Sequence, residues 1–383
     1  MKLLFVIPSI TNYFTFLEDL IDELTSRGHE IHLATSRKHI ARISAYRRDI
    51  SCTVHHIDFP RAINPIGHLR AAQKVQKLVE ELQPSLINIH FSAALFTTML
   101  GKKKNWPPTT GTIHGLGSPL ITGPRKRLIA FAEKWSTAKV DEVYVLTKDD
   151  ETYLKAMNSK ATVRVISSFG MGCDLKRFHP DAVSRQQRAS LAADLGIDAH
   201  HFVYIFIGRQ TNFKGFDRVI EAFLETKKER PNSKLILVGE KDRIHPTALR
   251  KPLEKALKED PDIIAVGWQE NVPDYLALAH VNVFPSDREG LPVNLMESLA
   301  MGVPVITVDS RGCRDVVRDQ MDGFVVKQGD RLALVREMLR LQNDSKLLGR
   351  MQVEAVAGRQ RFDRQLFMDE QFSIYSRLTG RPV

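Results

Sequence analysis

The sequence has few cysteines and no long apolar run. Among its 383 residues, Cys52, Cys173 and Cys313 stand far apart and form no Cys-x-x-Cys spacing. This pattern argues against a disulfide framework and a cysteine-rich zinc site, and it is typical of a cytoplasmic protein. No apolar run approaches the roughly 18 residues that cross a bilayer, and Pro8 ends the apolar start, so we expect a first buried strand rather than a signal peptide. Any contact with a membrane would be peripheral.

Acidic residues are fewer than basic residues, and the excess of positive charge is unevenly distributed along the chain. The formal net charge is +10, and most of it falls within residues 1–183, where residues 102–104 and 125–127 are the densest basic clusters. These clusters suit anionic lipid, a diphosphate-linked acceptor or nucleic acid, or they form an ordinary solvated surface. No basic run is interleaved with aromatic residues and no zinc spacing is present, so we expect no nucleic-acid partner.

Strand and helix patterns alternate along the chain, which predicts parallel sheets flanked by helices. In the first half, Leu17, Leu20, Ile21 and Leu24 recur at helical spacing between apolar strand segments. The alternation restarts at the continuously apolar residues 202–207, which are typical of a strand covered on both faces. Further strands are expected at residues 235–238, 263–266, 281–284, 303–308 and 324–326.

Chain length and this restart predict two α/β domains, each a doubly wound, Rossmann-like unit, with a ligand in the cleft between them. The polar residues 179–200 are the expected linker. We therefore expect domains at residues 1–183 and 184–363. Residues 364–383 form a terminal helix that packs back on the first domain or simply on the second.

Residues 285–304 carry the most informative pattern. A strand is expected to end at Pro285, a tight loop to carry Glu289, and a helix to begin near Pro292. The start of that helix seats a diphosphate on the backbone of Gly290, Leu291, Pro292 and Val293. Glu297 would lie roughly 10 Å from Glu289 if residues 290–297 are helical, which suits gripping two ends of one ligand. Alternatively, Glu289 only caps the helix and Glu297 is a surface residue.

Arg209 and Lys214 follow the first strand of the second domain. A planar guanidinium and a compact ammonium both suit phosphate oxygens, and Gly215 lets the backbone pass close to a ligand. Alone, such side chains usually face solvent, but ahead of residues 285–304 they indicate an anion site. His114, which follows a strand of the first domain, either lines the cleft or is an ordinary core histidine.

These motifs together resemble those of the retaining family 4 glycosyltransferases, which have the GT-B fold. The residues that carry the resemblance are Gly208-Arg209-x4-Lys214-Gly215, Val238-Gly239, and Pro285-Ser286-x2-Glu289-Gly290-Leu291-Pro292-x4-Glu297. In the first half, residues 112–115 are similar to the family's strand-ending histidine motif, and residues 170–180 to its hinge signature.

The resemblance implies metal-independent transfer of a sugar from a nucleotide-activated donor, in which the acceptor attacks on the face that the diphosphate leaves. Arg209 and Lys214 would hold the diphosphate, His114 and Glu289 would contact the transferred sugar, and Glu297 would bind the ribose hydroxyls. No cofactor or metal is expected, and no Asp-x-Asp motif follows a strand.

A narrower similarity links residues 64–65, 114–118 and 310–315 to bacterial transferases that add N-acetylhexosamines to undecaprenyl-diphosphate-linked sugars. It implies a UDP-sugar donor, a lipid-linked glycan acceptor, and a basic acceptor-binding first domain at the anionic inner face of the cell membrane. The expected acceptor-binding residues are Ser9, Asn12, Lys103, Arg125 and Arg127. Residues 8–14 depart from the paired-glycine loop of many family members.

Two other functions remain open on the sequence. A sugar-nucleotide epimerase or hydrolase of the same fold would release nucleotide without any acceptor. A non-catalytic nucleotide-sugar-binding protein would bind the donor and never turn it over.

Overall fold

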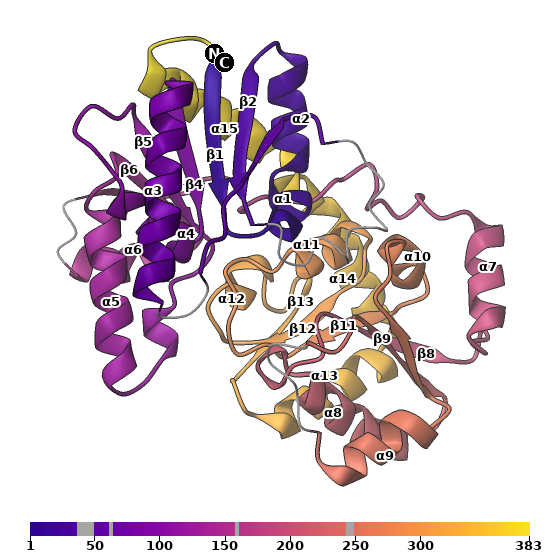
Figure 1. The fold of residues 1–383 in the computed structure, drawn as a ribbon. Coiled ribbons are helices and arrows are strands. Elements are labelled where there is room, and N and C mark those ends of the chain that lie inside the picture. The colour runs from indigo at the N-terminus through magenta and orange to yellow at the C-terminus, as the bar shows by residue number, and fades with distance from the viewer. Residues whose placement is uncertain (37–49, 61–63, 158–160, 243–248) are drawn as a thin grey trace. The chain divides into compact units, whose positions relative to one another are not determined.

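The computed structural model describes residues 1–36, 50–60, 64–157, 161–242 and 249–383. They form two compact units, Met1–Gly170 with Phe367–Val383, and Met171–Leu366 (Figure 1). Each unit has its own parallel sheet. The structure therefore has the two Rossmann-like folds that the sequence predicts.

The first unit is built on a parallel sheet of seven strands in the order β3-β2-β1-β4-β5-β6-β7. The strands are Lys2–Ile7 (β1), Glu30–Thr35 (β2), Thr53–His56 (β3), Leu86–His90 (β4), Thr109–Ile113 (β5), Glu142–Val145 (β6) and Thr162–Val165 (β7). Every residue of β4 is buried, including the polar Asn88 and His90, as expected for a strand covered on both faces. The strand order reverses between β1 and β4, so the loops after these strands lie where doubly wound folds bind ligands.

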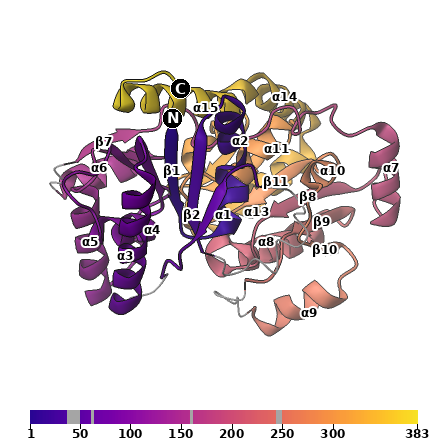
Figure 2. The same ribbon diagram turned by 45° about the horizontal axis from the view of Figure 1, so that its top comes forward.

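Helices cover the sheet of the first unit. They are Ile10–Phe16 (α1), Glu18–Ser26 (α2), Pro65–Leu82 (α3), Ser92–Leu100 (α4), Pro124–Thr137 (α5) and Lys148–Ala156 (α6), with a short 3-10 helix at Ser118–Leu120 (η2). Figures 1 and 2 show α3, α4 and α5 beside one another, and α4 contacts both neighbours. Helix α3 begins at Pro65 because the Asn64 side chain accepts a hydrogen bond from the Gly67 amide at 2.9 Å.

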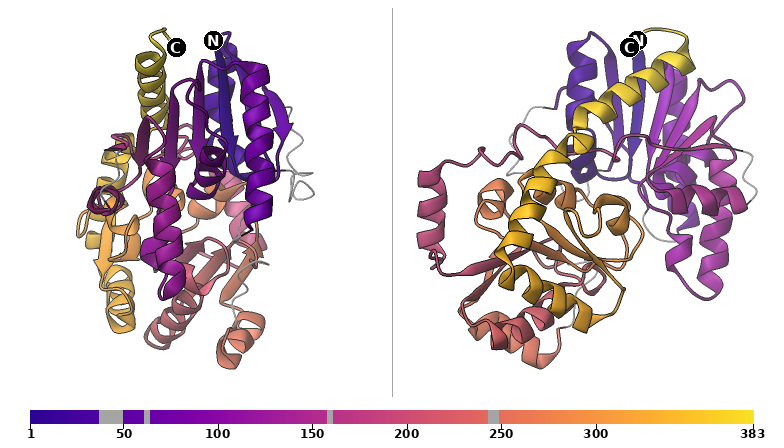
Figure 3. Two further views of the ribbon diagram at one scale, coloured as in Figure 1. Left: turned by 60° about the vertical axis from the view of Figure 1, so that its left-hand side comes forward. Right: turned by 180° about the vertical axis from the view of Figure 1, so that it is seen from behind.

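The terminal helix Arg364–Thr379 (α15) completes the first unit from Phe367 onward. Tyr375 is fully buried, with its ring edge against Phe5 and its hydroxyl 2.8 Å from the Asn88 Nδ2 donor. Arg377 donates two hydrogen bonds of 2.7 Å to Glu142, which holds the pKa of that carboxyl below its usual value. Figure 3 shows this helix lying across the strands of the first unit, with both chain ends close together.

The second unit has a parallel sheet of six strands in the order β10-β9-β8-β11-β12-β13. The strands are Phe202–Ile207 (β8), Ser233–Val238 (β9), Ile263–Gly267 (β10), Val281–Phe284 (β11), Val305–Val308 (β12) and Gly323–Val326 (β13). The helices are Arg185–Asp194 (α7), Phe216–Glu229 (α8), Lys251–Glu259 (α9), Val272–Leu276 (α10), Val293–Ala300 (α11), Cys313–Val316 (α12), Arg331–Asn343 (α13) and Ser345–Ala357 (α14), with 3-10 helices at Asn212–Lys214 (η3) and Arg359–Phe362 (η4).

The boundary between the units differs from the predicted one. The chain enters the second unit at Met171, not after residue 183, because residues 171–183 bind there. The Cys173 amide donates to the Phe362 carbonyl at 2.8 Å, and Arg359 donates to the Phe178 carbonyl at 2.9 Å. The expected linker at residues 179–200 also contains helix α7, which a capping box between Ser184 and Gln187 starts.

Within the described ranges, no helix combines the length and the apolar character that spanning a bilayer requires.

Candidate functional site

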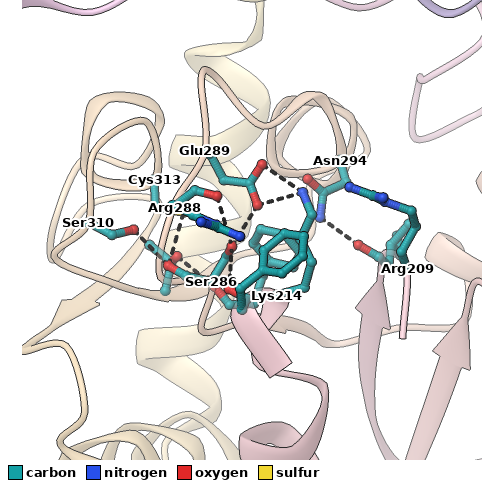
Figure 4. Close-up of polar contacts among 12 residues, drawn as sticks. Arg209, Lys214, Ser286, Arg288, Glu289, Asn294, Ser310 and Cys313 are labelled. Atoms are coloured by element: carbon teal, nitrogen blue, oxygen red, sulfur yellow. Dashed lines mark hydrogen bonds and ion pairs between the residues drawn. The ribbon is translucent and has the colours of Figure 1, made fainter. Parts of the chain in front are cut away.

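The second unit brings the predicted anion-binding residues to the switch point of its sheet. Strands β8 and β11 are neighbours, and the strand order reverses between them. The loop after β8 contains Arg209 and Lys214, and the loop after β11 contains Glu289. Doubly wound folds bind their ligands at such a point, beyond the carboxyl ends of the strands. Figure 4 shows Lys214, Glu289 and Asn294 together above the strand ends, with Arg209 beside them.

Lys214 and Glu289 form an ion pair across the two loops. The Lys214 ammonium lies 2.6 Å and 2.7 Å from the two carboxylate oxygens of Glu289. Only 17% of the Lys214 side chain and 10% of the Glu289 side chain are exposed, so solvent screens this pair poorly. Ser286 also donates to Glu289 at 2.6 Å. An ammonium has three N–H bonds and Glu289 accepts two of them, which leaves one for an anion.

Three cations gather around the ring of Phe213. The Arg288 guanidinium lies 4.6 Å from the ring centroid, Arg209 lies at 5.6 Å and the Lys214 ammonium at 5.9 Å. Arg209 is also ion-paired with the buried Asp242, which follows β9. The Arg209 side chain is 54% exposed, so its guanidinium remains accessible to a ligand.

Helix α11 begins at Val293, with Pro292 in an extended conformation, so residues 290–292 form a loop and not the first helical turn. Within the described ranges, no side-chain hydrogen bond caps this helix start, and the Glu289 carboxylate accepts from Lys214 and Ser286 instead. The alternative that Glu289 merely caps the helix is therefore wrong. Asn294 ties the first turn to β8 by donating to the Ile207 carbonyl at 2.8 Å. The helix start is thereby fixed beside Lys214.

Glycines let the loops of this site pack main chain against main chain. Gly215 has a φ of 78°, and a side chain there would overlap Pro285. Gly312, with a φ of 83°, lies against the carbonyl of Gly290, where any Cβ atom would overlap it. Both positions therefore require glycine, and they join the loops after β8 and β12 to the loop that carries Glu289.

Glu297 lies on α11, half-buried, and is neither a surface carboxylate nor part of the Lys214 cluster. Burial raises the pKa of Glu297 to about 7, and Arg177 and Arg364 oppose the rise. At neutral pH this carboxyl is divided between its acid and its carboxylate, so it can accept or donate hydrogen bonds.

His114, in the first unit, stands at the end of β5 beside the end of β4. The His90 Nδ1 and His114 Nε2 atoms are 2.9 Å apart. Phe91 stacks on His114 with ring centroids 4.2 Å apart, and Phe16 contacts the same ring at 5.0 Å. Phe91 holds a positive φ of 73°, a strained conformation that packing must maintain. His114 is thus held in place by contacts with His90, Phe91 and Phe16.

The hydrogen bond between the two histidines favours one tautomer. His90 is fully buried, and its Nε2 has no hydrogen-bond partner within the part of the chain that the structure describes. Because a buried N–H without an acceptor is rarer than an unpaired acceptor, the His90 proton belongs on Nδ1. His114 then accepts at Nε2 and keeps its own proton on Nδ1. Burial lowers the pKa of His114 to about 3, so the ring is neutral and presents a donor.

The loop after His114 is held from helix α5. Glu133 accepts hydrogen bonds from the Gly117 amide at 2.8 Å and from the Ser118 hydroxyl at 2.5 Å. Burial raises the pKa of the Glu133 carboxyl, and these hydrogen bonds oppose the rise. The carboxyl therefore fixes the path of residues 115–118.

The five expected acceptor-binding residues do not form one cluster of contacts. Ser9 is buried and its hydroxyl lies 2.8 Å from that of Thr11, while Asn12 is half-buried on α1. Lys103 is exposed and ion-paired with Glu80 at 2.6 Å. Arg125 and Arg127 are exposed in the first turn of α5. Ser9 is therefore the least accessible of the five.

Sequence reasoning missed several side chains of both sites. Arg288 lies within the motif, but its position over Phe213 depends on the fold. Asp242 and Asn294 contribute only through contacts with other strands, and His90 has no motif of its own. Among the described residues, no group of three or more His, Cys, Asp or Glu side chains is arranged to hold a metal ion.

The sequence matches two known protein families. Residues 201–344 match the family described as "Glycosyl transferases group 1", and residues 2–147 match "Glycosyl transferase 4-like". The two matches together cover most of the chain. The chain belongs to the glycosyltransferases of GT-B fold, with a 4-like domain in its first half and a group 1 domain in its second.

Individual relatives are distant in sequence, and those described here match three quarters or more of the chain. A Campylobacter jejuni N,N'-diacetylbacillosaminyl-diphospho-undecaprenol α-1,3-N-acetylgalactosaminyltransferase is 22% identical, covering 99% of each protein. An Escherichia coli UDP-Gal:α-D-GlcNAc-diphosphoundecaprenol α-1,3-galactosyltransferase is 21% identical over 75% of this chain and 74% of its own. The structure of Anabaena Alr3699/HepE in complex with UDP superposes with a TM-score of 0.79 at 18% identity, covering 98% of this chain and 99% of that one.

The tautomer assignment gives a spectroscopic prediction. Long-range ¹H–¹⁵N NMR should find the His114 ring neutral between pH 5 and 8, with its proton on Nδ1. His90→Phe keeps a ring but removes the nitrogens, so we expect mixed tautomers of His114. Turnover should fall about tenfold, which lies within the roughly 1–3 kcal/mol cost of leaving a buried polar group without a hydrogen bond.

His280 provides an internal reference of opposite tautomer. The Nδ1 atom of His280 accepts from the Val203 amide at 3.0 Å, so the proton of His280 lies on Nε2. We expect this tautomer in the wild-type protein and in His90→Phe alike. A His114 ring that titrates near pH 6.5 in the wild-type protein would contradict the assignment.

Proposed function

We propose that the protein is a retaining, metal-independent glycosyltransferase that moves a sugar, most suitably an N-acetylhexosamine, from a UDP-sugar to a lipid-diphosphate-linked glycan. The reaction forms a bond between an acceptor hydroxyl oxygen and the anomeric carbon, and it breaks the bond from that carbon to the diphosphate. The hydroxyl proton leaves with the departing diphosphate or to solvent. The pathway is the assembly of bacterial surface polysaccharide, such as capsule or O-antigen.

One observation carries the proposal: the cations Arg209, Lys214 and Arg288 converge beside the uncapped start of α11 at the switch point. Negative charge grows on the leaving diphosphate in the transition state, and preorganised cations and amide groups stabilise it there. These side chains supply the electrostatic stabilisation that a divalent metal provides in other transferases. Glu289 holds Lys214 in place and offers its carboxylate to the hydroxyls of the transferred sugar.

The remaining roles follow from hydrogen-bonding capacity. His114 is neutral and donates from Nδ1 to a sugar oxygen, while the ionised form of Glu297 accepts from the two ribose hydroxyls. The donor and acceptor classes are supported by the relatives. Two are named for transfer to a sugar on diphospho-undecaprenol, one of them with UDP-Gal, and the similar Anabaena structure contains UDP.

A lipid-linked acceptor also places the enzyme at the membrane. We propose a cytoplasmic protein that attaches peripherally to the inner face of the cell membrane. The net charge of +10 supports attraction to anionic lipid.

The proposal predicts acceptor-dependent turnover that EDTA does not reduce. UDP-sugars are incubated with a diphospho-undecaprenol-linked sugar, UDP is quantified, and the product is identified by mass and by the anomeric coupling constant in NMR. We expect UDP release only with acceptor, and an α-linkage from an α-linked donor. UDP release without acceptor, with an altered free sugar, would instead identify an epimerase or hydrolase.

Removing the central cation should abolish turnover. In Lys214→Ala we expect kcat to fall at least a hundredfold, because a preorganised charge at a developing oxyanion contributes roughly 3–4 kcal/mol. Glu289 is left unpaired by this change, so Lys214→Ala/Glu289→Gln serves as a second variant and should be equally inactive.

Lys227→Ala is the matched control. Lys227 is a half-buried, ion-paired lysine of the same unit, 2.6 Å from Asp260, outside the site. It should retain wild-type kcat. Retained activity in Lys214→Ala would show that the assignment of the site is wrong.

Glu297 gives a pH prediction. Its pKa is raised to about 7 by burial, so its ionised fraction, the form that accepts from ribose, falls as pH drops through 7. UDP binding measured by calorimetry should weaken about tenfold between pH 8 and pH 6. In Glu297→Gln the affinity should be lower and should show only the pH dependence of the phosphate itself. Parallel pH profiles in the two proteins would exclude the ribose role.

A further inference from the structure

Helix α5 has an outward face on which large apolar and basic side chains alternate. Leu128 is 49% exposed and Phe131 is 63% exposed. Arg127 and Lys134 are exposed on the same helix. At 100° per residue these four side chains fall within one sector of the helix. The opposite sector, with Glu133, Ser136 and Thr137, is buried against the unit.

Neighbouring segments also expose large apolar side chains. The first turn of α3 exposes Ile66 at 64% and Leu69 at 54%, and η2 exposes Leu120 at 39%. Phe96 of α4 links the helices, because its ring contacts His68 of α3 at 5.3 Å and Trp135 of α5 at 5.7 Å. Figures 1 and 2 show α3 and α5 in the same layer. We call Ile66, Leu69, Leu120, Leu128 and Phe131, with Arg127 and Lys134, the basic–apolar face. Arg125 and Lys126 are exposed beside it in the first turn of α5.

The positive charge of this face is not neutralised locally. Helix α5 has no acidic residue in its first turn, where Arg125, Lys126 and Arg127 stand. Neither these three nor Lys134 forms an ion pair with any residue in the described part of the chain. Some exposed lysines elsewhere are paired, as Lys255 and Lys258 are with Glu259 and Glu254. Within the described part of the chain, the four cations of α5 therefore remain available to an anionic partner.

We propose that the basic–apolar face docks on an anionic phospholipid bilayer, with Leu128 and Phe131 inserted at the headgroup boundary and the basic side chains against lipid phosphates. A mixed face of Leu and Phe with Lys and Arg is the composition of helices that lie in a membrane interface. Nucleic acid would leave the apolar side chains without a partner. A second copy would bring two positive faces together at a two-fold interface.

The inference does not depend on the proposed reaction, because vesicle binding requires neither donor nor acceptor. It adds a surface to that reaction. The same unit contains His114, so docking would keep the histidine-bearing unit at the interface where a lipid-linked sugar is dissolved.

Sedimentation with vesicles tests the proposal. The full-length protein is mixed with vesicles of 30% phosphatidylglycerol in phosphatidylcholine, or of phosphatidylcholine alone, in low and high salt. We expect binding to the anionic vesicles at least tenfold tighter than to the neutral ones, and weaker binding at high salt. Equal binding to both vesicles, or none to either, would overturn the proposal.

Two variants divide the face into its components. Leu128→Ser/Phe131→Ser and Arg125→Gln/Lys126→Gln/Arg127→Gln should each bind anionic vesicles at least tenfold more weakly. All replaced side chains are exposed, and unchanged thermal melting confirms that the variants fold. The matched controls, Leu332→Ser at a site 70% exposed and Lys255→Gln/Lys258→Gln on α9, should bind like the wild type.

A depth measurement and a mass measurement complete the test. Phe131→Trp should be quenched by brominated acyl chains, whereas Leu332→Trp should not. Analytical ultracentrifugation tests whether a second copy of the chain covers the face instead. If the wild type forms a dimer that Leu128→Ser/Phe131→Ser dissociates, and does not bind vesicles, the face belongs to a dimer interface and lipid docking is refuted.

Discussion

The ion pair between Lys214 and Glu289 joins the two loops on which the second unit's site depends. It spans β8 and β11, the strands between which the sheet order reverses. Its carboxylate also accepts from Ser286, and the Phe213 carbonyl accepts from the Asp287 amide at 2.8 Å, so each loop is held to the other by both charge and backbone. The pair therefore positions a cation before any ligand arrives, and the energetic cost of ordering that side chain is met during folding.

The first unit prepares a group of different character. In His114 the structure combines a buried hydrogen-bond partner, a stacked aromatic ring and a strained backbone at Phe91. Burial keeps the imidazole neutral, which suits a donor that must not carry charge toward a cationic, electron-poor sugar carbon. In the proposed reaction, the second unit would offer fixed positive charge to a diphosphate, and the first unit would offer a neutral donor to a sugar.

The sequence allowed the fold and the central motifs to be predicted, but few of the contacts. Continuous apolar runs located β8 and β11 because parallel strands covered on both faces admit little else. The Lys214 and Glu289 motifs were found because their spacing follows strand ends. His90 and Asp242 were not found, because their roles depend on which strands become neighbours. The predicted boundary at residue 183 was wrong because the hydrogen bonds of Cys173 reach residues almost two hundred positions later, which local composition does not reveal.

The placement of Tyr375 has a consequence for synthesis of the protein. Its ring is fully buried between groups that include Phe5 and Asn88, which are synthesised long before it. The sheet of the first unit therefore lacks part of its interior until Tyr375 has been synthesised. During translation the second unit, which is continuous in sequence, can complete its core first, and the first unit must keep an apolar surface shielded until α15 emerges.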